Sequence, residues 1–323
     1  MDSEPSASPS SADESRAGPI QIKGFEISHS LGAGAMGEVY AAKDLSCDRT
    51  VAIKVLPGPA KERAVGRFRR EIAAVARVSH PNLVPIYTAG ETQDGLLYYA
   101  MERVDGPTLE DAAGALGARA CATLVVKLAR ALEYAHSLGV VHRDVKPRNV
   151  IIDEHGEPRL LDFGLARVVG QPTLTSDDQV VGTPSYMAPE IARGDASEAG
   201  PSADVYGLGV TLYEMLTGRL PFAEPATFSE HVRRLATEIP PSPREVSSKE
   251  IPPELDRICL KALDPDPQRR YRSCGELGDD LEAWLEGGGR GGAGSSLLVP
   301  VLVLAGVAIV VLLIVLGVLV AGS

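Results

Sequence analysis

Short segments in which apolar and polar residues partly alternate dominate the first hundred positions. The clearest are FEISHSLGAG (25–34), GEVYAAKD (37–44) and TVAIKVL (50–56), and two more lie near 84–89 and 96–102. Alternation with a period of two, bounded by Gly, Pro and Asp, is typical of β-strands. We therefore expect a small lobe built mainly of strands.

Helical periodicity appears once inside this lobe and then dominates the rest of the body. Residues 61–78 carry apolar side chains three or four positions apart, namely Phe68, Ile72, Val75 and Val78. From about residue 108 onward the pattern is mostly helical, for example in 119–138 and 203–217. The sequence thus predicts an α+β fold, with a β-rich N-lobe (23–104), a larger helical C-lobe (105–286) and a ligand site between them.

The two ends of the chain differ in composition from this body. Residues 1–22 are rich in Ser, Pro, Ala and acidic residues and predict a disordered tail, and the Gly/Ser-rich residues 287–296 predict a flexible linker. The 25 residues 297–321 contain no charge. As a helix they would span roughly 37 Å, more than a hydrocarbon core of about 30 Å, so we expect a single transmembrane helix rather than a buried core helix.

The overall charge narrows the range of partners. The formal net charge is −11, whereas a protein that binds nucleic acid generally presents a basic surface, so we expect no nucleic acid. One basic pocket for a phosphate remains compatible with this charge. The four cysteines are scattered without a CxxC spacing, which favours reduced residues over zinc ligands or disulfides.

One stretch of the helical lobe carries many polar groups. VVHRDVKPRNVII (140–152) places a histidine, two arginines, an aspartate, a lysine and an asparagine between apolar runs of the kind that form buried strands. Two interpretations are open at this point. The stretch is either a solvated loop without chemistry or a set of side chains that converge on a highly charged ligand.

A glycine-rich segment lies near the start of the N-lobe. LGAGAMGEV (31–39) spaces three glycines in the pattern GxGxxG, which lets a backbone turn tightly and approach phosphates. A dinucleotide-binding fingerprint would continue into a helix, whereas the residues that follow here have the pattern of a strand. We therefore favour a β-hairpin that covers a nucleotide over a plain hairpin turn.

The segment VAIK (51–54) ends on a lysine. Lys54 shares one face of the strand with Ala52, opposite its apolar neighbours, so its side chain is expected to point toward the ligand site. A lysine in such a place needs a counter-charge, and Glu71 on the following helix is a candidate. The alternative for Glu71 is a solvated pair with Arg67, four residues earlier.

Four polar residues suit a metal site and a proton transfer. Asp144 and Asn149 lie five positions apart with Lys146 between them, and Asp162 comes 18 residues after Asp144. Asn149 and Asp162 offer oxygen ligands of the kind that Mg²⁺ binds together with water and phosphate oxygens. Asp144 is a candidate acceptor for a hydroxyl proton, and Lys146 is a candidate cation beside a transferring phosphoryl group.

Taken together, these motifs resemble those of the eukaryotic-type protein kinase family over about residues 23–286. Five motifs follow the order of the family signature: the Gly-rich loop (32–37), VAIK (51–54), HRDVKPRN (142–149), DFG (162–164) and APE (188–190). HRDVKPRN and GTPSYMAPE (182–190) are similar to the serine/threonine branch. A kinase domain joined to a membrane helix is similar to the bacterial members.

The resemblance implies a two-lobed kinase fold that uses ATP with Mg²⁺, or Mn²⁺ in its place. The residues expected to bind ATP are Leu31, Gly32, Gly34, Gly37, Val39, Ala52, Lys54, Met101, Glu102 and Val104. The expected metal ligands are Asn149 and Asp162. The expected catalytic group is Asp144 as base, Lys146 as phosphate neutraliser, Lys54 paired with Glu71 in the active state, and Thr183 beside the acceptor hydroxyl. Asp204 is expected to brace the catalytic loop, and Glu190 to pair with Arg270.

The resemblance also implies a regulatory segment over about 162–190. Its hydroxyl candidates are Thr173, Thr175 and Ser176. A phosphate on one of them would pair with Arg143 and order the segment. The rival interpretation is that Asp177 or Asp178 already supplies the negative charge.

We therefore expect an ATP-dependent serine/threonine protein kinase, held in the cell membrane by one span with its kinase domain in the cytoplasm. Its partners would be proteins that carry Ser or Thr, the membrane and, by family resemblance, a second copy of the chain. The alternative is a membrane-tethered pseudokinase scaffold.

Overall fold

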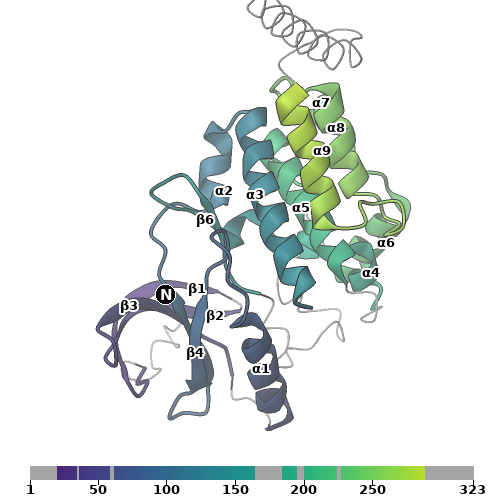
Figure 1. The fold of residues 1–323 in the computed structure, drawn as a ribbon. Coiled ribbons are helices and arrows are strands. Elements are labelled where there is room, and N and C mark those ends of the chain that lie inside the picture. The colour runs from purple at the N-terminus through teal and green to yellow at the C-terminus, as the bar shows by residue number, and fades with distance from the viewer. Residues whose placement is uncertain are drawn as a thin grey trace, which may run out of the picture. The chain divides into compact units, whose positions relative to one another are not determined.

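The computed structural model describes residues 20–34, 36–58, 62–163, 184–194, 200–223 and 227–287. A β-rich lobe is followed by a helical lobe, as the sequence predicts (Figure 1). The expected transmembrane helix (297–321) and nearly all of the expected linker lie outside these residues. No helix within the described ranges is long and apolar enough to cross a membrane.

The N-lobe contains one antiparallel sheet of five strands in the order β1-β2-β3-β5-β4. Its strands are β1 (Phe25–Gly34), β2 (Gly37–Asp44), β3 (Arg49–Val55), β4 (Ile86–Glu91) and β5 (Leu97–Glu102). The helix α1 (Glu62–Val75) contributes Phe68, Ile72 and Val75 to the main core. The strands and this helix agree with the sequence prediction, because period-two and helical patterns differ clearly here.

The sheet buries both of its faces, in two separate clusters. Ala52 on β3 lies in the main core with Tyr99 and Met101 of β5. The alternate residues of β3 pack in a second cluster with Tyr98 and Ile22. The predicted division of β3 into two faces is therefore confirmed. Ile22 is 4% exposed, so this residue, assigned to the tail from composition, is packed on the sheet.

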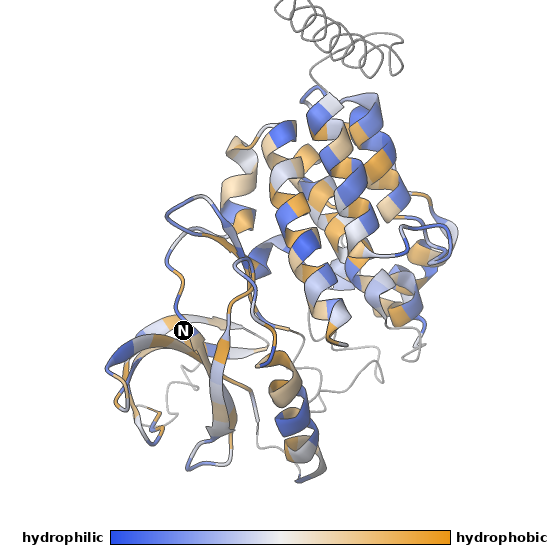
Figure 2. Ribbon diagram, viewed as in Figure 1, coloured by the Kyte–Doolittle hydropathy of each residue, from blue (hydrophilic) through white to orange (hydrophobic). Residues whose placement is uncertain are grey.

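The C-lobe is built around α5, most of whose residues are buried. Its helices are α2 (Leu109–Ala112), α3 (Ala118–Ser137), α4 (Pro189–Ala192), α5 (Pro201–Thr217), α6 (Phe228–Thr237), α7 (Pro243–Val246), α8 (Pro253–Ala262) and α9 (Cys274–Gly287), with short 3-10 turns η1 (Ala113–Ala115), η2 (Pro147–Asn149) and η4 (Pro184–Tyr186). A two-stranded sheet joins β6 (Val150–Ile152) to β7 (Pro158–Leu160). Figure 2 shows apolar and polar positions side by side along the outer helices, the pattern of helices with one buried face.

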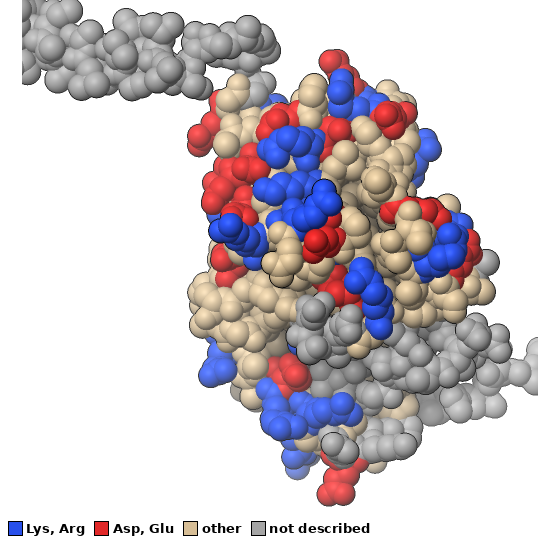
Figure 3. All heavy atoms as spheres, turned by 90° about the vertical axis from the view of Figure 1, so that its right-hand side faces the viewer, with Lys and Arg blue, Asp and Glu red and all other residues tan. Residues whose placement is uncertain are grey.

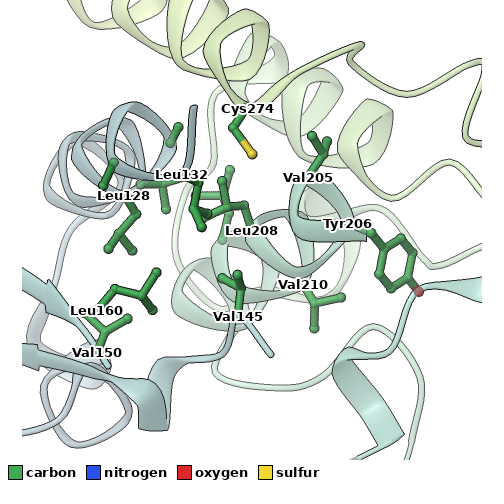
Figure 4. Packing of buried hydrophobic residues seen from close by; sticks show 14 of the residues in the cluster. Leu128, Leu132, Val145, Val150, Leu160, Val205, Tyr206, Leu208, Val210 and Cys274 are labelled. Carbon is green, nitrogen blue, oxygen red and sulfur yellow. The ribbon is translucent and has the colours of Figure 1, made fainter. Parts of the chain in front are cut away.

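The apolar residues within and after the polar stretch 142–149 are anchors in this core. Val145 and Val150 are buried beside Leu160 and residues of α3 and α5 (Figure 4). At Gly207 of α5 an added Cβ would lie 3.0 Å from the Cβ of Val145 and 3.1 Å from its carbonyl oxygen. The missing side chain at Gly207 therefore lets the loop pack directly on α5.

A buried ion pair fastens α4 to the segment before α9. The two guanidinium nitrogens Nη1 and Nη2 of Arg270 donate to Oε1 and Oε2 of Glu190, each at 2.8 Å, and both side chains are completely buried. Arg270 also donates to the carbonyl oxygens of Asp264 and Ser202. The pair expected from the sequence is confirmed, in the bidentate geometry that makes arginine–carboxylate pairs strong.

Glu190→Gln should lower the free energy of unfolding by about 3–5 kcal/mol, because it leaves the Arg270 guanidinium buried without its counter-charge. Urea unfolding measures this change. The control is Glu254→Gln, which removes a carboxylate from the exposed pair with Arg257 and should cost less than about 1 kcal/mol. Equal losses in the two variants would contradict the assignment.

Candidate active site

Lys54 and Asp162 connect the N-lobe sheet to the segment after β7. Lys54 Nζ donates to Oδ2 of Asp162 at 2.5 Å, and the two side chains are 8% and 18% exposed. Burial alone would raise the pKa of Asp162, but the charge of Lys54 and hydrogen bonds from Lys54 and Tyr99 outweigh it and hold this pKa below its usual value. Asp162 is therefore an ionised carboxylate at neutral pH.

Two polar side chains of the stretch 142–149, those of Lys146 and Asn149, converge on the carboxylate of Asp144. Its Oδ2 accepts from Lys146 Nζ at 2.8 Å and from Asn149 Nδ2 at 2.9 Å. Asn149 Nδ2 also donates to the backbone oxygen of Asp144 at 2.8 Å. The side chains of Asp144 and Lys146 are 10% and 8% exposed, so this part of the stretch is not a solvated loop.

Asp204 on α5 holds the backbone of this loop. Its Oδ2 accepts from the amide of His142 at 2.8 Å, and its Oδ1 accepts from the amide of Arg143 at 2.6 Å. Oδ2 also lies 2.7 Å from Nε2 of His136. Arg143 has a φ of 65°, a conformation that a non-glycine residue rarely adopts without such support. The predicted brace is confirmed.

The same loop contacts the segment that carries Asp162. His142 Nε2 lies 2.7 Å from the carbonyl oxygen of Leu161. The His142 ring also packs against Phe163, with ring centroids 4.9 Å apart. Asp162 has a φ of 57°, so its backbone too is held in the left-handed region between these contacts. Asp144 and Asp162 are thereby positioned by one connected set of contacts.

The glycine-rich segment forms the predicted hairpin, in which Gly34 pairs with Gly37. Gly37 has a φ of 118°, and a Cβ there would lie 2.1 Å from the carbonyl oxygen of Val55, so the fold itself requires this glycine. A Cβ on Gly32 or Gly34 would meet no atom within 4 Å. These two positions leave backbone accessible to a ligand, which fits a phosphate-covering loop.

The residues expected to contact adenine lie around β3 and β5. Ala52 pairs with Met101, and Val39 of β2 pairs with Lys54. Leu31 is exposed at 45% at the edge of the sheet, and Val104 lies partly buried after β5. The expected apolar side chains thus lie on the neighbouring strands β1, β2, β3 and β5, except for Val104, which follows β5.

Glu102 takes part in contacts that the sequence did not predict. Its amide donates to the carbonyl oxygen of Pro85 at 3.1 Å, and its carboxylate pairs with Arg159. The N–H of Glu102 is therefore already used within the protein.

The structure does not bring Glu71 to Lys54. Glu71 is exposed, and among the described residues it has neither a hydrogen bond nor an ion pair, with Lys54 or with Arg67. Lys54 is paired with Asp162 instead. Exposed arginines, including Arg69 and Arg70, share the helix, and Figure 3 shows positive residues gathered over α1. The expected Lys54–Glu71 pair thus requires a different position of α1.

Tyr99 is a site residue that the sequence reasoning missed. Its hydroxyl donates to Oδ1 of Asp162 at 2.6 Å, and it is paired with Lys54 across β3 and β5. Burial, followed by the negative charge of Asp162, raises the pKa of Tyr99 well above its usual value, so the phenol stays protonated. Because side chains alternate along β5, Tyr99 lies on the same face of the strand as Met101. This shared face was the sequence signal that could have identified Tyr99 as a site residue.

Asn149 and Asp162 fit the donor chemistry of a hard divalent cation. The amide nitrogen of Asn149 is bonded to Asp144, which leaves its side-chain oxygen as the acceptor, and Asp162 is ionised. Within the described ranges no group of three or more His, Cys, Asp or Glu residues could hold a metal by itself. A Mg²⁺ ion here would need water and phosphate oxygens to complete its shell, as is usual for this ion.

Several expected site residues lie outside the part of the chain that the structure describes. They are Thr183, Thr173, Thr175 and Ser176. Arg143, the expected partner of a phosphate, has an exposed side chain.

Comparison with known proteins gives a consistent result. The family model described as Protein kinase domain matches residues 25–278. The chain is 38% identical over 282 residues to the probable serine/threonine-protein kinase PknB of Bifidobacterium longum, covering 82% of this chain and 40% of that protein. It is 37% identical over 264 residues to the serine/threonine-protein kinase PrkC of Bacillus subtilis, covering 80% of this chain and 39% of that protein.

A solved structure is similar over nearly the same region. The crystal structure of the PknI kinase domain of Mycobacterium tuberculosis has a TM-score of 0.65 and 29% sequence identity, covering 83% of this chain and 99% of that chain. The two protein relatives are much longer, and this chain spans well under half of each. The similarity therefore concerns the two-lobed body.

Asp204→Asn should loosen the loop, because an amide presents one acceptor oxygen and turns an NH₂ group toward a backbone donor. Amide hydrogen exchange at His142 and Arg143 should become faster by at least about tenfold, as expected for loss of a hydrogen bond to a charged group. The control is Asp153→Asn, which alters a carboxylate that accepts two amides in the β6–β7 turn. Unchanged exchange at the two loop amides would rule out the bracing role.

Proposed function

We propose, since the chain belongs to the protein kinase family, that it transfers the γ-phosphoryl group of Mg-ATP to serine and threonine hydroxyls of proteins. The observation that carries the proposal is the convergence of two groups of polar residues. Asp144, Lys146 and Asn149 share hydrogen bonds, and Lys54 and Asp162 form a mostly buried ion pair. These charges are paired with one another, as buried charges require, and the set suits a polyphosphate with its metal.

Each of these residues has a role in the proposed transfer. Asp144 would accept the proton of the attacking hydroxyl, and Lys146 holds a positive charge 2.8 Å from Oδ2 of this carboxylate. Lys54 would neutralise non-transferred phosphates, while Asn149 and Asp162 would hold the metal. When bound, Mg-ATP supplies the phosphoryl group, and its metal offsets the charge that develops during transfer. The protein contributes position and electrostatic stabilisation rather than covalent chemistry.

The alternative is a pseudokinase scaffold that binds Mg-ATP without transfer. The separation of Glu71 from Lys54 is the observation in its favour. Against it stands the complete set of proposed base, cation and metal ligands. A kinase that waits for α1 to move accounts for both observations, so we favour the enzyme.

We further propose that residues 297–321 anchor the protein in the cell membrane as one span, with the kinase body in the cytoplasm, where ATP is present. The support is the length and uniform apolar character of this segment. Regulation would use a phosphate on Thr173, Thr175 or Ser176 paired with Arg143, whose side chain is exposed. Association of two N-lobes is a family-level proposal without a supporting contact here.

Asp144→Asn should reduce phosphoryl transfer by about 10²–10⁴-fold, because the amide cannot accept the hydroxyl proton. The full chain is incubated with labelled ATP, Mg²⁺ and a serine/threonine peptide, and the phosphorylated residues are mapped by mass spectrometry. Asp105→Asn, at an exposed residue after β5, is the control and should retain full activity.

Phosphate on the three hydroxyl candidates in the wild type would support autophosphorylation. Transfer that persists in Asp144→Asn would show that this residue is not the base. Nucleotide binding without transfer in the wild type would favour the scaffold.

Deletion of residues 297–321 should move the protein from the membrane fraction to the soluble fraction without loss of specific activity. The physical reason is that no other segment of comparable length lacks charge. A chain without residues 2–18 serves as the control and should stay with the membranes. Fractionation followed by detection of the protein measures both, and a deleted chain that still sediments with membranes would contradict the anchor.

A further inference from the structure

We propose that Tyr99 is a positioning residue that orients the carboxylate of Asp162 for metal binding through its phenolic hydroxyl. The proposal rests on the proposed function, in which Asp162 is a metal ligand. It assigns a role to a residue outside the five motifs that define the family resemblance.

The geometry fixes the carboxylate of Asp162 from two sides. Tyr99 donates to Oδ1 at 2.6 Å, and Lys54 donates to Oδ2 at 2.5 Å. Tyr99 and Lys54 are direct partners on neighbouring strands, so both donors come from one rigid sheet. A carboxylate held at both oxygens by one sheet has little freedom to rotate.

The burial of Tyr99 confines its hydroxyl to the hydrogen bond with Asp162. Tyr99 is 1% exposed, and its ring is packed in the main core with Ala52 and Met101. The ring therefore fixes where the hydroxyl lies, and the hydroxyl fixes Asp162. Asp162 itself has a φ of 57°, so its backbone conformation also depends on outside support.

These two hydrogen bonds leave room for a metal. An ionised carboxylate offers about four acceptor positions over its two oxygens, and Tyr99 and Lys54 occupy one on each. No other described residue donates a hydrogen bond to this carboxylate, so the remaining positions are left for a hard cation while both donors stay in place. Residues that hydrogen-bond a metal ligand typically change metal affinity by about 10–100-fold when they are mutated.

The test compares Tyr99→Phe with Tyr98→Phe in the full chain. Tyr99→Phe removes one oxygen and keeps the ring, so the core packing should be preserved. Tyr98 is the adjacent tyrosine of β5, lies in the second cluster beside Phe25, and undergoes the same chemical change on the opposite face. Thermal unfolding establishes that both variants are folded.

Two measurements are made at equilibrium: ADP affinity as a function of Mg²⁺ concentration by calorimetry, and Mn²⁺ binding in the presence of ADP by electron paramagnetic resonance. Tyr99→Phe should require about tenfold more of either metal, and Tyr98→Phe should match the wild type. In a kinetic assay, saturating Mg²⁺ should restore most of the turnover lost by Tyr99→Phe.

Metal dependence that is unchanged in Tyr99→Phe would overturn the proposal. Tighter metal binding would also overturn it, because Tyr99 would then compete with the metal for Asp162 rather than orient it. Both binding measurements are independent of turnover. Failure of phosphoryl transfer would therefore count against the proposed function and leave the assignment of Tyr99 to be decided by the affinities.

Discussion

The buried carboxylate of Asp204 is the contact on which the candidate site depends. It accepts two consecutive backbone amides, those of His142 and Arg143, and so compensates its own burial with hydrogen bonds. Because most residues of α5 are buried, this carboxylate ties the loop to the core of the C-lobe. The close approach at Gly207 adds a packing constraint on the same loop. The order of the loop is thus a property of the C-lobe core.

A second constraint joins the two lobes through charge. Lys54 and Tyr99 reach from the sheet to Asp162, and His142 connects that segment to the loop held by Asp204. These contacts form a chain from β3 to α5. Glu71 takes no part in this series of contacts, because it is exposed on α1. The position of α1 is therefore not fixed by an ion pair with Lys54.

Much of this arrangement could be predicted from the sequence, because it follows from local periodicity and from motif order. The faces of β3, the hairpin at Gly34 and Gly37, and the Glu190–Arg270 pair all agree with prediction. The partner of Lys54 could not be predicted, because Asp162 lies 108 residues away along the chain and local periodicity does not show which carboxylate comes close to Lys54. Tyr99 was missed because an aromatic residue in a buried strand is usually core, and periodicity does not reveal where a hydroxyl points.

The most direct measurement of the central claim is the fate of the γ-phosphoryl group in a single turnover. Full chain in excess over labelled ATP is mixed with Mg²⁺ and a serine/threonine peptide, and the products are separated. We expect the label to appear as phosphoserine or phosphothreonine on protein or peptide. Label that remains in bound, intact ATP would contradict this expectation and identify a nucleotide-binding scaffold.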